Sequence, residues 1–311
     1  MNGMLDLAGL TKLVESGDID TVVVAFTDMQ GRLIGKRITG HFFLSSVVKE
    51  THACNYLLAC DMEMEPVPGF KIASWDKGYG DFVMKPDLDT LRLVPWLEKT
   101  ALVLTDVLNE DGTPAAHAPR SILKHQLKRL ADRGWCAKKG SELEFYCYNE
   151  SYAELQAKGY RDMTRSGSYS EDYHIFQTTK EEPLIRAIRN GMDACGIPVE
   201  TSKGEWGPGQ EEINFIYDEA LRMADNHVIY KNGAKEIAYL QDKAITFMAK
   251  PTFEHAGSSC HIHSSLWQID GDKALFSDAS DPQGMSPIMR SYVAGLLAGA
   301  RDMTYFLAPF I

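Results

Sequence analysis

The sequence has no run of about 18 uncharged apolar residues, the length that a membrane span needs, so we expect no membrane partner. The opening stretch MNGMLDLAGLTKLVESGDID lacks the basic region and apolar core of a secretory signal. Six cysteines are scattered along 311 residues without close pairs, which is typical of reduced thiols in a cytoplasmic protein. Positive charge is also scarce. The net charge of −11 argues against nucleic acid as a partner, because phosphate backbones require a basic face.

What the sequence does contain indicates a globular protein built of two parts. Its hydrophobic fraction of 44% is normal for a protein with a buried core. Residues 20–40 read DTVVVAFTDMQGRLIGKRITG, a β-branched run, a turn and a second strand, and TALVLTDVL predicts another strand. We therefore expect a strand-rich domain over residues 1–110. The loop NEDGTPAAHAPR then leads into a second domain, residues 111–311.

Apolar periodicity and terminal glycines predict the helices of the second domain. Leu123, Leu127 and Leu130 recur at helical spacing, and Gly134 and Gly196 follow two of the helices as stop signals. We expect helices at 119–134, 181–196, 218–241 and 286–308, and strands at 138–149 and 244–251.

Two histidines stand close together in the stretch CHIHSSLW, which runs from residue 260 to 267. On a strand, His261 and His263 would share one face, and Cys260 and Ile262 would share the other. Two imidazoles on one face are compatible with metal ligands, with phosphate contacts and with buried polar side chains. This stretch alone does not choose among them, although Cys260 is expected to be a packing residue.

Carboxylates gather in two other segments. In SELEFY, Glu142 and Glu144 would share one face of a strand while Leu143 points into the core. In VETSKGEWGPGQEEINF, the Gly-Pro-Gly turn brings chain segments close together, so Glu205 and Glu212 can converge. Glu212 and its neighbour Glu211 cannot both face inward. Taken singly, each segment also fits a charged surface.

Considered together, the three segments predict a cation site. Packing several carboxylates together is costly without cations, because like charges raise one another's pKa and burial adds to the effect. Oxygen ligands with an imidazole suit Mg²⁺ or Mn²⁺ better than Zn²⁺. Such ions would also supply the positive charge with which an acidic protein holds an anionic ligand.

Four fragments in this order resemble the glutamine synthetase family: ELEF, EWGPGQEEINF, ADNHVIYKNGAKEIA and FMAKPTFEHAGSSCHIHSSL. FTDMQGRLIGKR resembles the opening of that family's N-terminal β-grasp domain. The resemblance implies an α+β fold, with a β-grasp domain over residues 1–110 and a catalytic domain over 111–311. The catalytic domain would contain an antiparallel sheet curved into a partial barrel and flanked by helices.

The resemblance also implies a ligase of nitrogen metabolism. It would use ATP to join the γ-carboxylate of glutamate to an amine or ammonia through a γ-glutamyl phosphate, with two or more Mg²⁺ or Mn²⁺ ions. The family builds homo-oligomers, commonly dodecamers of two hexameric rings. Its active sites lie between the N-terminal domain of one subunit and the catalytic domain of its neighbour.

Site residues follow from the resemblance by position. Glu144, Glu205 and Glu212 match ligands of one metal ion, and Glu142 and His261 match ligands of another. Of these, Glu144, Glu205, Glu212 and His261 are the expected catalytic set. The expected nucleotide contacts are Glu200, His263 and Ser265, and the backbone at Gly257 is expected to face glutamate.

One departure concerns the acceptor. The family's glutamine synthetases carry Asp-Gly-Ser-Ser in the N-terminal domain, whereas this sequence reads THACNYLLACDME over residues 51–63. The uncharged Asn55 and the bulky Tyr56 resemble the branch that uses organic amines, namely polyamines, ethanolamine or alkylamines. Alternatives are a glutamine synthetase that uses ammonia and a non-catalytic nucleotide-binding scaffold.

The second departure concerns the end of the sequence. The chain stops in the apolar run FLAPFI, where the family's next motif, Asn-Ser-Tyr-Lys-Arg, would follow. We therefore expect this sequence to be one piece of a longer chain, truncated at its C-terminus, and to be inactive alone.

Overall fold

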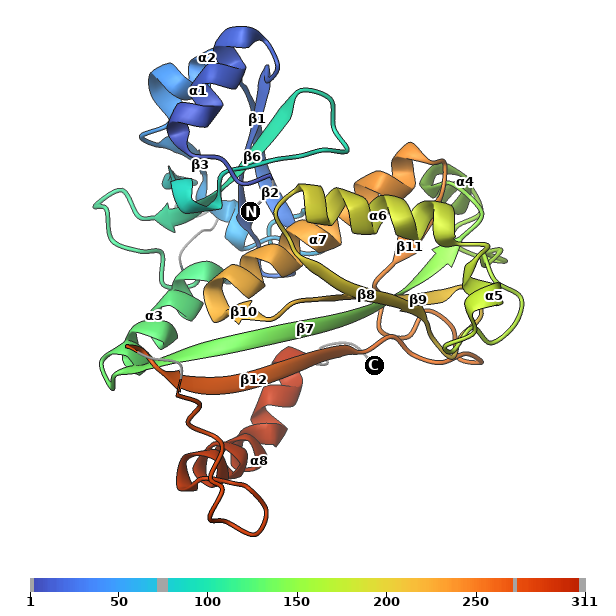
Figure 1. Cartoon of the computed structure of the whole chain (residues 1–311). Coiled ribbons are helices and arrows are strands. Elements are labelled where there is room, and N and C mark those ends of the chain that lie inside the picture. The colour runs from blue at the N-terminus through green and yellow to red at the C-terminus, as the bar shows by residue number, and fades with distance from the viewer. Residues whose placement is uncertain (1–2, 72–77, 271–272, 308–311) are drawn as a thin grey trace.

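The computed structural model describes residues 3–71, 78–270 and 273–307. Two β-sheets and the helices between and around them form an α+β fold (Figure 1). The last four residues of the apolar end, on which the expectation of truncation partly depends, lie outside the described part of the chain.

The first sheet is built from the N-terminal third of the chain and has the strand order β2-β1-β6-β4-β3, with β5 also paired to β6. Strands β1 and β6 run parallel, and the other neighbours are antiparallel. The strands are β1 (Thr21–Thr27), β2 (Leu33–Thr39), β3 (Thr51–Cys54), β4 (Asp81–Pro86), β5 (Arg92–Leu93) and β6 (Thr100–Leu108). The expected strands at residues 20–40 and 100–108 are thus confirmed.

Both faces of this sheet are covered, which explains the continuous apolar run of β1. Val22, Val24 and Phe26 pack on one side against helix α1 (Leu7–Ser16) and the turns α2 (Gly40–Phe42) and η1 (Phe43–Val47). Ala25 faces the other side, toward the helices of the second half of the chain. Helix α1 is fixed at its start by Asp6, whose carboxylate accepts the Gly9 N–H at 2.7 Å.

The second sheet carries the predicted site residues and is antiparallel throughout. Its order is β10-β7-β9-β8, with β11 and β12 also paired to β7. The strands are β7 (Trp135–Tyr148), β8 (Val199–Gly204), β9 (Gln210–Phe215), β10 (Asp218–Glu219), β11 (Ala244–Thr246) and β12 (Cys260–Gln268). The long strand β7 is therefore the element against which most of the others are aligned.

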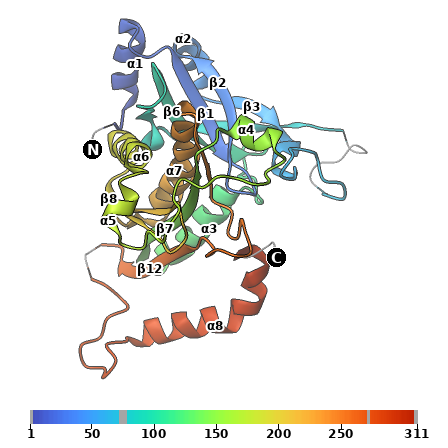
Figure 2. The same ribbon diagram turned by 90° about the vertical axis from the view of Figure 1, so that its right-hand side faces the viewer.

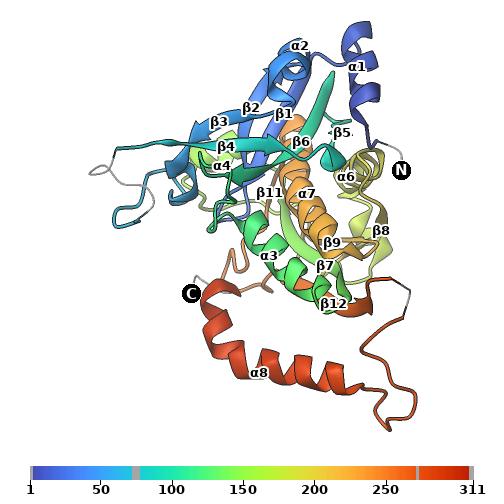
Figure 3. The same cartoon turned by 90° about the vertical axis from the view of Figure 1, so that its left-hand side faces the viewer.

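Helices α6 (Glu182–Ala194) and α7 (Ala220–Leu240) lie between the two sheets (Figures 1 and 3). Their apolar side chains form one core with Leu143 and Phe145 of β7 and with Leu102 and Leu104 of β6. Leu143 thus points into the core, as its position beside two glutamates predicted. The remaining helices are α3 (Pro119–Ala131), α4 (Tyr152–Ala157), α5 (Ile175–Thr178) and α8 (Pro287–Leu307).

Helix α8 extends away from the second sheet beyond β12 (Figure 2). The Ser286 hydroxyl caps its start by accepting the Met289 N–H at 3.1 Å. No helix in the described ranges is both long enough and apolar enough to cross a membrane.

Three local expectations were wrong in detail. The strand predicted at 244–251 ends at Thr246, whose hydroxyl accepts the Met248 N–H at 3.2 Å and so competes with the ladder. The helix predicted to reach Gly134 ends at Ala131, and Gly134 closes the following turn with a φ of 72°. Cys260 is exposed rather than packed.

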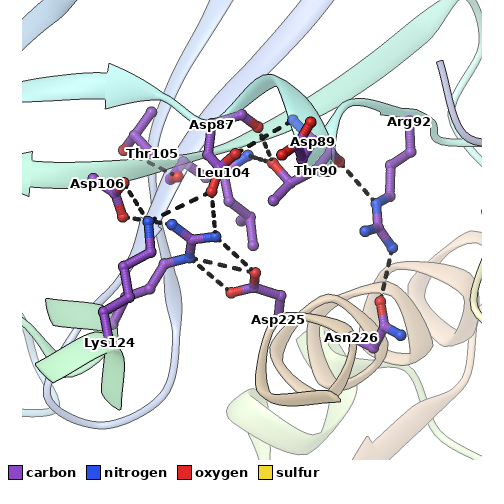
Figure 4. A network of polar contacts seen from close by, with 12 residues as sticks. Asp87, Asp89, Thr90, Arg92, Leu104, Thr105, Asp106, Lys124, Asp225 and Asn226 are labelled. Atoms are coloured by element: carbon purple, nitrogen blue, oxygen red, sulfur yellow. Dashed lines mark hydrogen bonds and ion pairs between the residues drawn. The ribbon is translucent and has the colours of Figure 1, made fainter. Parts of the chain in front are cut away.

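A buried ion-pair network joins the N-terminal part of the chain, which forms the first sheet, to helices α3 and α7 of the remainder (Figure 4). The Arg120 guanidinium on α3 contacts Asp225 on α7 at 2.9 Å, and Asp87 and Asp106 beside the first sheet at 2.7 and 2.5 Å. Arg120 is only 8% exposed and Asp225 only 5%. Since one guanidinium satisfies carboxylates from both halves, it fixes their relative position.

We expect Arg120→Met to lower the free energy of unfolding by about 3–5 kcal/mol, because it leaves buried Asp225 without a counter-charge. Urea denaturation measures this loss. The control is Lys128→Met, which breaks the exposed Lys128–Asp132 pair and should change stability little. Equal effects of the two substitutions would show that the network does not hold the halves together.

Candidate metal and nucleotide site

The site begins with the pairing of β7 and β9. Glu144 lies directly opposite Glu212, and Glu142 lies opposite Asn214. On the other side of β7, strand β12 places His261 opposite Glu142. Because alternate side chains of a strand share a face, these registers direct the predicted ligands to one side of the sheet.

Glu205 joins them through the Gly-Pro-Gly turn, as the sequence predicted. The Glu205 N–H donates to the Gln210 carbonyl at 2.8 Å and so closes the turn, in which Gly209 has a φ of 73°. One carboxylate oxygen each of Glu144, Glu205 and Glu212 lies within 4.8 Å of the others.

Donors at the start of β9 and just before β12 hold the Glu144 carboxylate in place. It accepts the Gln210 side-chain amide at 3.1 Å, the Ser259 N–H at 3.0 Å and the Ser259 hydroxyl. Gln210 is itself held, because its amide also donates to the Gly257 carbonyl and its oxygen accepts the Gly207 N–H, each at 3.0 Å. Glu144 is therefore oriented before any ligand binds.

The cluster attracts positive charge. Burial, together with the neighbouring Glu205 carboxylate, raises the pKa of Glu212 to about 7. The Lys203 ammonium pairs with the Glu205 carboxylate and lies 4.6 Å from the centre of the Tyr173 ring. Three converging carboxylates in a partly buried position are the ligand set that hard divalent cations prefer.

The two histidines have different partners. His263 Nε2 lies 3.0 Å from a Glu142 oxygen, whereas His261 Nε2 lies 3.8 Å from a Glu144 oxygen and 3.1 Å from the Ser259 hydroxyl. Both imidazoles are exposed. They share a face of β12, as expected, but they contact different carboxylates.

These groups line two adjoining clefts. The first has a volume of about 550 Å³ and contains Glu144, Glu205, Glu212, His261, Lys203 and Tyr173. The second has a volume of about 520 Å³, and its walls include Glu200, His263, Ser265, Lys138 and Trp267. Glu142 and Asn214 line both clefts and so form their common wall. The structure thus brings the three predicted nucleotide contacts into one cleft and the predicted metal ligands into the other, with Glu142 shared by both.

The predicted substrate contacts lie in different places. The Gly257 carbonyl accepts from Gln210, and a Cβ at this position would lie 2.8 Å from the Ala249 carbonyl oxygen. Asn55 and Tyr56 lie in the 3-10 turn η2 (Asn55–Leu58) beside the first sheet. Neither appears in the walls of either cleft as the described residues form them.

Sequence reasoning missed two features. Lys203 and Tyr173 belong to the first cleft, and nothing in their local pattern distinguishes them from surface residues. A second acidic cluster, of Glu171, Glu181 and Glu211, lies on the other face of β9. The position of Glu211 could have indicated this cluster, because it directly precedes Glu212 on a strand and must point to the opposite face.

The chain as a whole resembles known proteins. Residues 116–311 match the catalytic domain of glutamine synthetase. A γ-glutamylethanolamide synthetase, GlnA4, of Streptomyces coelicolor is 48% identical over 99% of this chain and 66% of its own length. A glutamate–isopropylamine ligase of a Pseudomonas species is 35% identical over 96% of this chain and 65% of its own. A glutamine synthetase of Thermotoga maritima is 30% identical over 97% and 65%.

Solved structures agree with this relationship. The GmaS/ADP complex superposes with a TM-score of 0.82 at 26% identity, over 97% of this chain and 65% of the other. Apo GmaS gives a TM-score of 0.80 at the same identity. The chain spans about two thirds of the length of these relatives. With the α+β fold, the paired acidic strands and these similarities in agreement, the chain belongs to the glutamine synthetase family.

Proposed function

We propose that this chain carries the ATP and glutamate sites of a ligase that joins the γ-carboxylate of glutamate to a small organic amine. The observation that supports this most directly is the adjacency of the two clefts. One holds the carboxylate cluster of Glu144, Glu205 and Glu212, the other holds Glu200, His263 and Ser265, and Glu142 forms part of both walls.

This arrangement suits phosphoryl transfer followed by amide formation. A free γ-carboxylate is a poor electrophile, whereas an acyl phosphate has phosphate as its leaving group. A nucleotide in the cleft of His263 would direct its terminal phosphate past Glu142 toward the carboxylate cluster. Glutamate in the first cleft would lie near the Gly257 backbone, which the Gln210 amide links to Glu144.

The donor set fits divalent cations, and Mg²⁺ or Mn²⁺ is the proposed choice. Glu144, Glu205 and Glu212 would hold one ion, and Glu142 and His261 would contribute to a second. Bound ions would neutralise phosphate charge during transfer. Gln210 and Ser259 keep Glu144 oriented for this role, and Lys203 offsets part of the negative charge of Glu205.

The proposed amine acceptor is supported by residues outside the two clefts. Tyr56 packs edge to face on Tyr79 with ring centres 5.1 Å apart, and the Asn55 Oδ1 beside them is buried without a hydrogen-bond partner among the described residues. Apolar ring surface next to a free acceptor suits an organic amine better than a small ammonium ion. In a ring of subunits, this surface would face the carboxylate cluster of the neighbouring chain.

The assembly and compartment belong to the same proposal. A homo-oligomer, of the dodecameric kind that the resemblance implies, would bring Asn55 and Tyr56 of one subunit to the first cleft of the next. Six unpaired cysteines are consistent with a reducing, cytoplasmic environment.

We expect Glu144→Gln to lower acyl-phosphate formation in the natural protein by about 100-fold or more, because the substitution removes a cation ligand while keeping its volume. Trapping with hydroxylamine in the presence of ATP and glutamate measures the step. Glu98→Gln, on an exposed residue remote from both clefts, is the matched control. Turnover preserved in Glu144→Gln would contradict the assigned role. Failure of the unaltered protein to bind Mg²⁺ or Mn²⁺ with ADP would favour a scaffold.

Ammonia as acceptor is the second candidate, since glutamine synthetases are among the relatives. We expect kcat/KM to be at least about tenfold higher for an organic amine such as ethanolamine or isopropylamine than for ammonia, because such amines gain apolar contact with Tyr56. A coupled ADP-release assay compares them. Ammonia turning over faster than every amine tested would overturn this preference.

The aromatic pair provides a sharper test. Tyr56→Ala should raise KM for the preferred amine and leave KM for ATP and glutamate unchanged, because Tyr56 lies outside both clefts. An unaltered amine KM would show that this surface does not receive the acceptor.

A further inference from the structure

A second group of carboxylates is buried behind the candidate active site. Glu171, Glu181 and Glu211 each place one oxygen within 4.8 Å of the others, and the three residues are 0%, 4% and 1% exposed. Glu211 lies on β9 directly before Glu212, so the two clusters occupy opposite faces of one strand. The second cluster lies on the core side and does not belong to the walls of either cleft.

The carboxylate oxygens of this cluster are buried, and few donors reach them within the described chain. Both oxygens of Glu171, both of Glu181 and Oε1 of Glu211 make no hydrogen bond of full geometry, although the Gly209 N–H lies near Glu171 and the Ser166 hydroxyl near Glu181. Burying a polar group without a partner is costly, and burying several negative charges together is more so. Burial and mutual repulsion accordingly raise the pKa of Glu171 to about 7 and that of Glu211 to about 9, so the cluster takes up positive charge, either as protons or as a bound cation.

Nearby cationic side chains do not supply it, because each is engaged elsewhere. Arg189 pairs with Glu182 at 2.6 Å. Lys180 donates to Gln177, and Lys243 donates to the Asn149 side chain at 2.9 Å. These cations lower the electrostatic cost of the cluster from a distance, yet none forms an ion pair with it in the described ranges.

We propose that Glu171, Glu181 and Glu211 bind a divalent cation of the size of Ca²⁺, at a site separate from the catalytic ions. Three oxygens no more than 4.8 Å apart can all lie within about 2.8 Å of one point, close to the roughly 2.3–2.6 Å of calcium–oxygen bonds. The ligands are hard oxygens. Hard oxygen ligands suit such a cation better than they suit a softer metal.

The position of this cation gives it a structural role in the active site. Glu171 lies in the loop before α5, Glu181 precedes the first residue of α6, and Glu211 lies on β9. Between the first two residues, Tyr173 and Thr178 form part of the wall of the carboxylate cleft. A cation bridging the three carboxylates therefore clamps this wall onto the strand that carries Glu212.

The packing around the cluster leaves no room for a side chain at position 167, which is glycine. A Cβ on Gly167 would lie 1.7 Å from Glu171 Oε1 and 2.5 Å from the Gly209 nitrogen. The loop is thus closed over the carboxylates, which is compatible with an enclosed ion but not with a larger ligand.

The test measures Ca²⁺ binding to the EDTA-stripped natural protein by equilibrium dialysis, together with the change in Tm that Ca²⁺ causes. Glu144→Gln weakens the catalytic cluster and should still bind one Ca²⁺ per chain at this site. Glu181→Gln should weaken binding there by about tenfold or more and reduce the rise in Tm, because it removes a charged ligand. Glu182→Gln, one residue away and paired with Arg189, is the matched control and should bind Ca²⁺ as the unaltered protein does.

A cluster that binds a cation and a cluster that does not predict opposite effects of Glu181→Gln on Tm. Without a cation, Glu181→Gln relieves charge repulsion and should raise Tm equally in EDTA and in Ca²⁺; this result would overturn the proposal. Absence of bound Ca²⁺ in Glu144→Gln would also overturn it, without requiring the Glu181 variant to fold. Neither measurement uses ATP, glutamate or an amine, so failure of the proposed ligase activity would leave this inference standing.

Discussion

The mutual repulsion of buried carboxylates is the constraint on which the rest of the structure depends. The pairing of β7 with β9 places Glu144 opposite Glu212, and the turn before β9 adds Glu205. Such an arrangement persists only if the sheet holds it and a positive charge balances it. The fold provides the first condition through the hydrogen bonds of Gln210 and Ser259 to Glu144. A bound cation would provide the second.

Strand β9 faces this constraint on both sides. Glu212 points to the cleft and Glu211 points to the core, so two consecutive residues place a carboxyl group on each face of the strand. In the cleft, Lys203 supplies one positive charge directly to Glu205. Behind the strand, Glu171 and Glu181 add to the charge of Glu211 with no such partner in the described chain. This asymmetry leaves the buried cluster without a cationic partner of its own among the described residues, and burial raises the pKa of Glu211 to about 9.

The two halves of the chain are joined by both apolar packing and charge. Helices α6 and α7 share one core with both sheets, which positions the strands of the site relative to the N-terminal sheet. Arg120 also fixes the orientation of α3 and α7 relative to the first sheet, because a guanidinium held between three carboxylates tolerates little displacement. The turn η2, which carries Tyr56 beside the first sheet, is thereby held at a fixed distance from the clefts of the second sheet.

The sequence by itself determined strands β1, β2 and β6, helices α3, α6, α7 and α8, and the convergence of Glu205 with Glu212, because alternation, glycine turns and apolar spacing are local properties. It also placed His261 and His263 on one face. Only the tertiary structure decided which carboxylate each histidine contacts, since that depends on the register between β12 and β7. The same is true of the cluster that Glu171 and Glu181 form with Glu211 of β9. These groups come from segments separated by many residues, and local patterns carry no information about which distant side chains the packing of α6 and the sheets brings together.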